Sequence, residues 1–77
     1  MSNFSKNMDT FAKRLKQLRL ESGLTLEELA AELQISPLTL KNYENSVRKP
    51  RVAYLCKIGD FYDVRINWLC GLDDIRK

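Results

Sequence analysis

Two short helical patterns with almost no chain between them constrain this sequence more than any other feature. They lie within residues 23–50, which read GLTLEELAAELQISPLTLKNYENSVRKP. The first pattern runs from Thr25 to about Leu33, and the second from Ser36 to about Glu44. A connection this short cannot act as a flexible linker, so the two helices must cross at a steep angle.

Local signals mark the ends of both helices. Thr25 and Glu28 have the spacing of a capping box, in which the threonine oxygen accepts an early amide and the glutamate reaches back. Ser36 is the expected cap of the next helix, and Pro37 suits its first position because that amide has no helical partner. Asn45 and Ser46 are expected to end it, because asparagine tolerates left-handed backbone.

The remaining chain is also helical by its periodicity, and no strand pattern competes. A helix is expected from about Asp9 to Ser22, followed by a left-handed turn at Gly23. Two more are expected, from about Val52 to Tyr62 and from about Ile66 to Cys70, with a turn at Asp63 between them. The sequence therefore predicts an all-α fold of five helices.

Apolar residues at helical spacing give the expected core. These residues are Phe11, Leu15, Leu18, Leu29, Ala30, Leu33, Leu40, Tyr43, Val52, Leu55, Ile58, Phe61 and Tyr62. Seventy-seven residues are enough for one modest core without metal or disulfide staples. We expect one domain over residues 9–71, with a short tail at 1–8 and another at 72–77.

Composition argues against several classes of protein. The apolar runs are too short to cross a bilayer, and residues 1–8 lack a secretory signal core, so a cytoplasmic location is expected. There Cys56 and Cys70 are expected as small buried hydrophobic residues and not as a disulfide. With no histidine and no glycine-rich phosphate loop, we expect no metal site, no cofactor and no enzymatic activity.

The net charge of +3 is informative mainly through its distribution. Residues 1–24 carry five basic and two acidic groups, residues 25–35 carry three acidic groups and no basic one, and residues 36–51 carry four basic groups against Glu44. Positive charge thus peaks on and after the second helix of the pair. This favours a polyanionic partner, although ordinary solvated surface charge explains much of the same pattern.

Taken in order, these segments resemble the phage-repressor and Cro family of helix-turn-helix domains (the xenobiotic-response-element group). The family's first two helices are similar to FAKRLKQLRLESGLTLEELAAEL, its turn, recognition helix and basic loop to ISPLTLKNYENSVRKP, and its last two helices to LCKIGDFYDVRINWLCG. The resemblance covers about residues 9–71. It implies a compact, lambda-repressor-like domain that binds double-stranded DNA.

The resemblance also implies where DNA would be contacted. The start of the second helix, at Leu26, is expected to meet a phosphate through its free amides, and helix 36–44 is expected in the major groove. The positions that match contacts to bases or backbone are Ser36, Pro37, Leu38, Thr39, Lys41, Asn42, Asn45, Arg48, Lys49 and Arg51. Arg19 and Glu44 match a pair that forms a salt bridge between the first and third helices.

Some residues depart from the family pattern. Leu26 stands where glutamine is frequent, and Ser46 where glycine is usual. Pro37 and Leu38 are apolar where many relatives have hydrogen-bonding side chains, so they cannot make the paired hydrogen bonds that distinguish bases. Base reading is then expected to rest on Asn42, which suits adenine, and Lys41, which suits guanine or a phosphate, with part of the specificity read from DNA shape.

Two functions remain in competition at this stage. The first is a sequence-specific transcriptional regulator, most simply a repressor, that binds a near-palindromic site as a homodimer. The second is an adaptor of the same fold (antitoxin-like or an accessory regulator) that binds a protein partner through the apolar spot at Pro37 and Leu38. The C-terminal apolar residues either cover one end of the core or form a dimer contact. These residues are Trp68, Leu69, Leu72 and Ile75. Asp73 and Asp74 are expected in a solvated tail.

Overall fold

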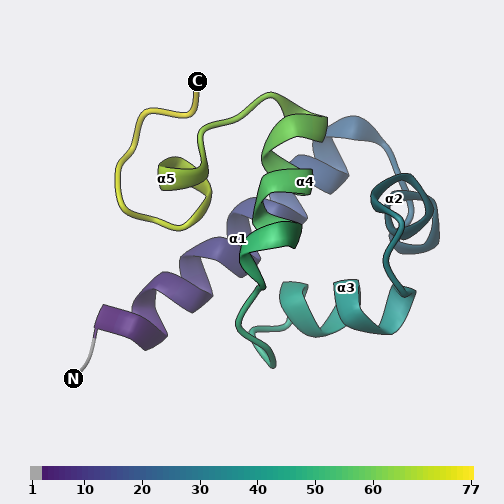
Figure 1. Cartoon of the computed structure of the whole chain (residues 1–77), viewed down its shortest axis with the longest axis horizontal. Coiled ribbons are helices and arrows are strands. Elements are labelled where there is room, and N and C mark those ends of the chain that lie inside the picture. The colour runs from purple at the N-terminus through teal and green to yellow at the C-terminus, as the bar shows by residue number, and fades with distance from the viewer. Residues whose placement is uncertain (1–2) are drawn as a thin grey trace.

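Five helices follow one another in the computed structural model, which describes residues 3–77 and the side chains from Met8 onward (Figure 1). They are α1 (Asn3–Ser22), α2 (Leu26–Leu33), α3 (Pro37–Glu44), α4 (Val52–Tyr62) and α5 (Ile66–Leu69). Within this described range there is no strand, and each helix is too short or too polar to cross a bilayer. The predicted all-α fold is confirmed.

Side-chain caps fix the starts of α2 and α3 where the sequence predicts them. The Thr25 hydroxyl accepts the Glu28 amide at 3.1 Å, and the Glu28 carboxylate accepts the Thr25 amide at 2.8 Å. This last hydrogen bond is the main reason that the pKa of Glu28 is lowered. Ser36 Oγ accepts the Thr39 amide at 3.0 Å, and Pro37 occupies the first turn of α3. At the start of each helix, these hydrogen bonds satisfy backbone amides that have no acceptor within the helix.

One predicted helix end is wrong. Helix α1 begins at Asn3 and not near Asp9, so the expected tail at 1–8 is helical from residue 3 on; residues 1 and 2 lie outside the described part. No proline or glycine occurs between positions 3 and 9, and adding residues to an existing helix is easier than starting one. Helix α3 ends at Glu44 as predicted, but Asn45 has φ −99° and it is Ser46 that takes the left-handed conformation, with φ 60°.

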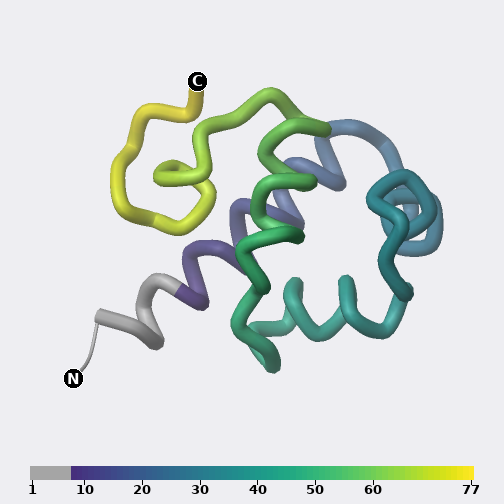
Figure 2. The backbone as a smooth tube through the Cα atoms, in the orientation of Figure 1, coloured from purple at the N-terminus to yellow at the C-terminus, as the bar shows by residue number. Residues whose placement is uncertain are grey.

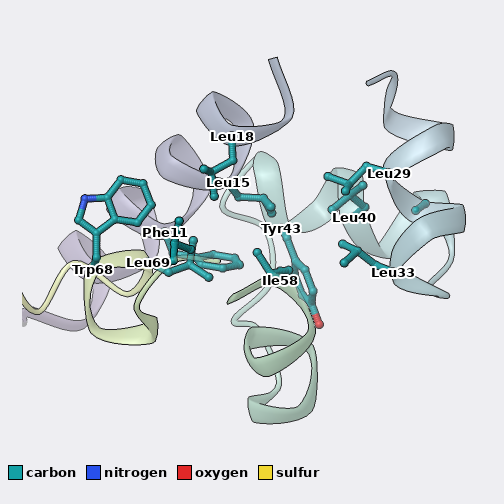
Figure 3. Close-up of a cluster of buried hydrophobic side chains, with 12 residues drawn as sticks. Phe11, Leu15, Leu18, Leu29, Leu33, Leu40, Tyr43, Ile58, Trp68 and Leu69 are labelled. Atoms are coloured by element: carbon teal, nitrogen blue, oxygen red, sulfur yellow. The ribbon is translucent and has the colours of Figure 1, made fainter. Parts of the chain in front are cut away.

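The core lies where α1, α3 and α4 meet, with α2 and α5 closing it from opposite sides (Figure 3). Tyr43 of α3 is only 2% exposed. Its ring lies 5.9 Å from the ring of Phe11 in an edge-on arrangement and 6.1 Å from the ring of Tyr54. Such tilted aromatic pairs add to the stabilisation from burial alone. Tyr43 thereby joins α3 to both α1 and α4.

Three residues of α4 differ from the prediction. Val52 is 75% exposed and Phe61 is 42% exposed, although both were expected in the core, and Cys56 is exposed although it was expected to be buried. The helix is buried most deeply at Ile58 and Gly59. Periodicity predicts which face of a helix points to the core, but it does not predict how far the neighbouring helices extend along that face. Val52 and Phe61 lie near the two ends of α4, where no neighbouring helix covers them fully.

The C-terminal segment folds back around α5 (Figure 2). The side chain of Asp74 is 99% exposed, as expected, whereas that of Asp73 is only 30% exposed. Arg14 of α1 donates to the backbone carbonyls of Trp68 and Asp73 and, at 3.1 Å, to the carboxylate of Asp74. The distance to the Asp73 carbonyl is 3.0 Å. A single α1 side chain therefore anchors α5 and the segment that follows it.

A second arginine completes this anchorage from the other end of the segment. Arg76 pairs with Glu21 of α1 at 2.7 Å. The guanidinium carbons of Arg14 and Arg76 lie 4.7 Å and 5.3 Å from the Trp68 ring centre. Such cation–π contacts favour an indole that is withdrawn from water, and Trp68 is only 6% exposed.

Two glycines with positive φ give a test of this arrangement. Gly23 has φ 73° and open space where a side chain would begin, whereas Gly71 has φ 80° and would place a Cβ 2.9 Å from Thr10 Cγ2. We expect Gly23→Ala to lower the free energy of unfolding by about 1 kcal/mol, the cost of a left-handed alanine. Gly71→Ala should cost about 1–3 kcal/mol more because overpacking is added. Urea denaturation of both variants measures this, and equal losses would contradict the close packing of Gly71 on α1.

Candidate nucleic-acid interface

Helix α3 separates a buried side from an exposed side. Leu40 is fully buried and Tyr43 nearly so, while Leu38 is 66% exposed. Pro37 and Lys41 are also exposed. The inward residues fix the helix against the core, so the outward residues are presented on a rigid support. Three of the predicted contact residues thus lie together on the open surface of one helix.

Two other predicted contacts on α3 are half-buried, namely Thr39 and Asn42. The hydroxyl of Thr39 is 2.8 Å from Ser36 Oγ, and its amide also bonds to that oxygen. Thr39 and Ser36 therefore form the start of α3 together, which gives both a structural role. The carbonyl of Asn42 accepts the amide of Val47 at 2.9 Å, so the backbone of Asn42 anchors the following loop.

The loop between α3 and α4 carries a cluster of exposed cations. Arg48, Lys49 and Arg51 are all exposed, as is Asn45. The carbonyl of Arg51 accepts the amides of the first turn of α4, at 3.0 Å each. With hydrogen bonds to a helix at each end, this short loop keeps its charges next to the end of α3. Val47 lies in the same loop and is 65% exposed, although no sequence motif marks it as a contact residue.

Arg19 and Glu44 form the predicted salt bridge between α1 and α3. The carboxylate accepts two hydrogen bonds from the guanidinium, at 2.7 and 3.1 Å, and the side chains are 13% and 5% exposed. The hydrogen bond to Glu44 is the main cause of the raised pKa of Arg19. Arg19 also donates to the carbonyl of Leu24 at 3.1 Å. One guanidinium therefore holds α1, the turn before α2 and the end of α3 together.

At the start of α2, the family resemblance implies a phosphate contact through backbone amides near Leu26. Its side chain is half-buried and packs against the core, so only its backbone amide is suited to a phosphate. The first turn of α2 also contains Glu27 and Glu28, both exposed. Their negative charge opposes the approach of a phosphate to this helix end. The favourable charge for a polyanion is therefore concentrated at α3 and its following loop.

No group of three or more metal-ligating side chains occurs in the described part of the chain. Within that part the two cysteines, Cys56 and Cys70, are free thiols. Burial raises the pKa of the Cys70 thiol, which disfavours the reactive thiolate.

Comparison with known proteins agrees with this geometry. A family model described as helix-turn-helix matches residues 15–69. The chain is 37% identical over 68 residues to the HTH-type transcriptional regulator ImmR of Bacillus subtilis, an alignment that covers 88% of this chain and 54% of ImmR. The chain thus spans about half the length of this curated relative.

Two solved structures share the fold. The N-terminal DNA binding domain of SinR from Bacillus subtilis is 30% identical with a TM-score of 0.75, and the match covers 84% of this chain and 93% of that domain. An HTH_3 family transcriptional regulator from Vibrio cholerae is 26% identical with a TM-score of 0.76, covering 90% of this chain and 39% of that protein.

The contribution of the buried ion pair to stability can be compared with that of an exposed ion pair in the same protein. Glu44→Ala leaves the guanidinium of Arg19 largely buried and unpaired, and we expect a loss of about 3 kcal/mol in the free energy of unfolding. Glu21→Ala breaks the exposed pair with Arg76 and should cost less than about 1 kcal/mol. Chemical denaturation of the two variants gives both values. A small effect of Glu44→Ala would show that the ion pair does not fix α3.

Proposed function

The chain belongs to the helix-turn-helix family, and we propose that it is a sequence-specific repressor of transcription that binds double-stranded DNA in the cytoplasm. The observation that carries this proposal is the exposed outer side of α3 beside a cationic loop. A rigid helix flanked by positive charge fits the major groove of DNA, where the helix reads bases while the charges meet phosphates. The SinR domain, which shares the fold, is described as DNA binding. Such a protein acts by occupying its site and not by catalysis.

The surface of α3 suggests how bases are read. Leu38 is an apolar residue of this helix that is 66% exposed, and it suits the methyl group of thymine. Lys41 is exposed and suits guanine or a phosphate, while Asn42, half-buried beside it, suits adenine. Pro37 begins the helix and offers only van der Waals contact. We therefore expect a short, thymine- and adenine-rich recognition sequence with weak discrimination at the position under Pro37.

The phosphate contacts are assigned to the loop after α3. Arg48, Lys49 and Arg51 provide three exposed cations within four residues, and Asn45 lies at the end of the recognition helix. Each phosphate neutralised by such a cation releases bound counterions, so affinity falls as salt rises. The exposed carboxylate of Glu27 repels a phosphate, so the start of α2 is expected to contact DNA more weakly than the loop does. The protein therefore docks mainly through α3 and the loop.

We further propose that two copies bind together on a near-palindromic site. Their recognition helices would enter successive major grooves roughly 34 Å apart. Of the four apolar residues considered for the contact, Trp68 and Leu69 are buried and form a core cap. Leu72 and Ile75 are 63% and 58% exposed and are the candidates for the two-fold contact.

A second candidate function rests on the exposure of Leu38. An exposed leucine next to Pro37 can also insert into a groove of a partner protein. The protein would then be an adaptor of the same fold. Salt separates the two functions. Binding through several phosphates predicts a steep loss of affinity between low and physiological salt, and a protein contact through Leu38 does not.

Selection of bound duplexes from a random DNA pool, followed by substitution, tests the proposed function. On the selected duplex we expect Asn42→Ala to weaken binding by about 1–3 kcal/mol and to relax one base position. Arg48→Ala should weaken binding to all duplexes and reduce the slope of log affinity against log salt by about 0.9. Lys77→Ala is the matched control, because Lys77 lies on the C-terminal segment away from α3 (Figure 1). Failure to enrich any duplex would contradict the proposal.

The dimer is tested separately with Ile75→Glu. The carboxylate is expected to disrupt an apolar two-fold contact while leaving the exposed position tolerant of the change. Sedimentation of the protein on a two-site duplex should then show one bound copy at concentrations where the unchanged protein shows two. Affinity for a single half-site should not change. Unaltered pairing in Ile75→Glu would exclude this surface as the dimer contact.

A further inference from the structure

A groove of about 350 Å³ lies between the C-terminal end of α2 and the C-terminal half of α4. The DNA contacts do not account for it. Its lining includes two acidic residues, Glu32 and Asp60, together with Lys57 and Phe61. The ammonium of Lys57 is engaged within the protein, because it donates to the carbonyl of Leu33 at 3.2 Å. The charge that this groove offers to a partner is therefore negative.

The exposed groups of this acidic groove are two carboxylates and one aromatic ring. Glu32 and Asp60 are exposed, and neither carboxylate forms an ion pair or a hydrogen bond within the described part of the chain. Phe61 is 42% exposed. Its ring packs edge-on against the ring of Tyr62, with 4.9 Å between the two ring centres. The aromatic group is thus held in place while one side of it remains open to water.

The outer face of α1 carries the complementary groups. Lys13, Lys16 and Leu20 follow one another at spacings of three and four residues, so they lie in one stripe along the helix. Both lysines are exposed and form no ion pair or hydrogen bond with another described residue, and Leu20 is 60% exposed. At 1.5 Å per residue this lysine stripe is about 10 Å long. Asp9 and Glu21 border the stripe at its two ends.

The two surfaces do not meet within one molecule. No ion pair joins the lysine stripe to Glu32 or Asp60 in the part of the chain that the structure describes. Helix α1 packs against α3 and α5, whereas α2 packs against α3 and α4, and in Figure 1 α1 passes behind α4. A contact between the stripe and the groove therefore joins one copy of the chain to another. Neither surface includes α3 or the cationic loop, so the DNA interface stays free.

We propose that the lysine stripe of one copy docks in the acidic groove of a second copy. Lys13 and Lys16 face the two carboxylates of the groove, and Leu20 lies against the ring of Phe61. Opposite charges then meet, and two apolar side chains that are open to water in a single copy cover each other. Because the two surfaces differ, the contact is head-to-tail and repeats from copy to copy. It is separate from the two-fold contact proposed above.

A contact of this size is weak in free solution. Exposed ion pairs contribute little individually, so a dissociation constant on the order of 1 mM is expected. On DNA, neighbouring copies are held side by side, and an effective concentration in roughly the millimolar range makes such a contact significant. The contact therefore makes binding to neighbouring sites cooperative, and this second step rests on the proposed function.

The contact is tested on the protein alone, without DNA, by charge reversal on each surface. In the unchanged protein, amide resonances of residues 13–20 and of the groove should shift as the protein concentration rises. A labelled variant with Lys13→Glu and Lys16→Glu has like charges on both surfaces, and these shifts should disappear. Adding an unlabelled variant with Glu32→Lys and Asp60→Lys restores opposite charges across the contact. The resonances of residues 13–20 in the labelled variant should then shift again.

A matched control separates the groove from general attraction between charged proteins. The variant with Glu27→Lys and Asp74→Lys has the same net charge as the groove variant but leaves the groove acidic. It should not shift the resonances of residues 13–20 in the labelled variant. The proposal is overturned if this control shifts them equally, or if the unchanged protein shows no shifts at the two surfaces. Shifts confined to the surroundings of Leu72 and Ile75 would mean that copies meet only through the two-fold contact, which also overturns it.

The cooperative step is measured on duplexes that carry two selected sites at graded spacings. At the spacing that brings the stripe to the groove, the unchanged protein should bind the second site about fivefold or more tightly than the first, the lower end of usual coupling between sites. The variant with Lys13→Glu and Lys16→Glu should bind both sites equally. Comparing two sites on one duplex cancels any general effect of its charge on DNA binding.

The two steps fail independently. If the resonance shifts appear but no spacing gives cooperative binding, the cooperative role is overturned and the contact between copies stands. If no duplex is bound at all, the proposed function fails, while the shifts of residues 13–20 still decide whether the stripe docks in the groove.

Discussion

The paired hydrogen bonds between Arg19 and Glu44 fix the tilt of α3, and the exposed surface depends on that tilt. The carboxylate is 5% exposed, so water competes poorly for it, and the same guanidinium also holds the carbonyl of Leu24. A helix of eight residues has little stability of its own. Its orientation therefore comes from this ion pair on one side and from the ring contacts of Tyr43 on the other. A change in either would move every outward side chain of α3 together.

Much of the fold could be predicted because its signals are local. The caps at Thr25 and Ser36, the turn at Gly23 and the bounds of α4 each follow from a few neighbouring residues. The start of α1 could not be predicted, because six preceding residues without a helix breaker fit helix or tail equally well. The exposure of Val52 and Phe61 depends on where neighbouring helices end in space, which no periodicity encodes.

In the candidate site, too, some features could be predicted from the sequence and others could not. The exposure of Lys41 and Leu38 follows from helical spacing, and the salt bridge follows from the family resemblance. Leu26 was assigned a phosphate contact through its backbone amide, and the inward packing of its side chain does not bear on that assignment. The anchoring of residues 72–77 was missed because it depends on Arg14, 54 positions from Trp68 along the chain. Only packing brings α1 and α5 into contact, so charge in the tail looked like solvated charge.

The anchored C-terminal segment has a consequence for anything joined to it. Lys77 lies 3.9 Å from the carboxylate of Asp63, at the corner between α4 and α5, and in Figure 1 this end of the chain points away from α3. A fluorescent protein or affinity handle attached after Lys77 would leave at that corner and would not obstruct the outer side of α3.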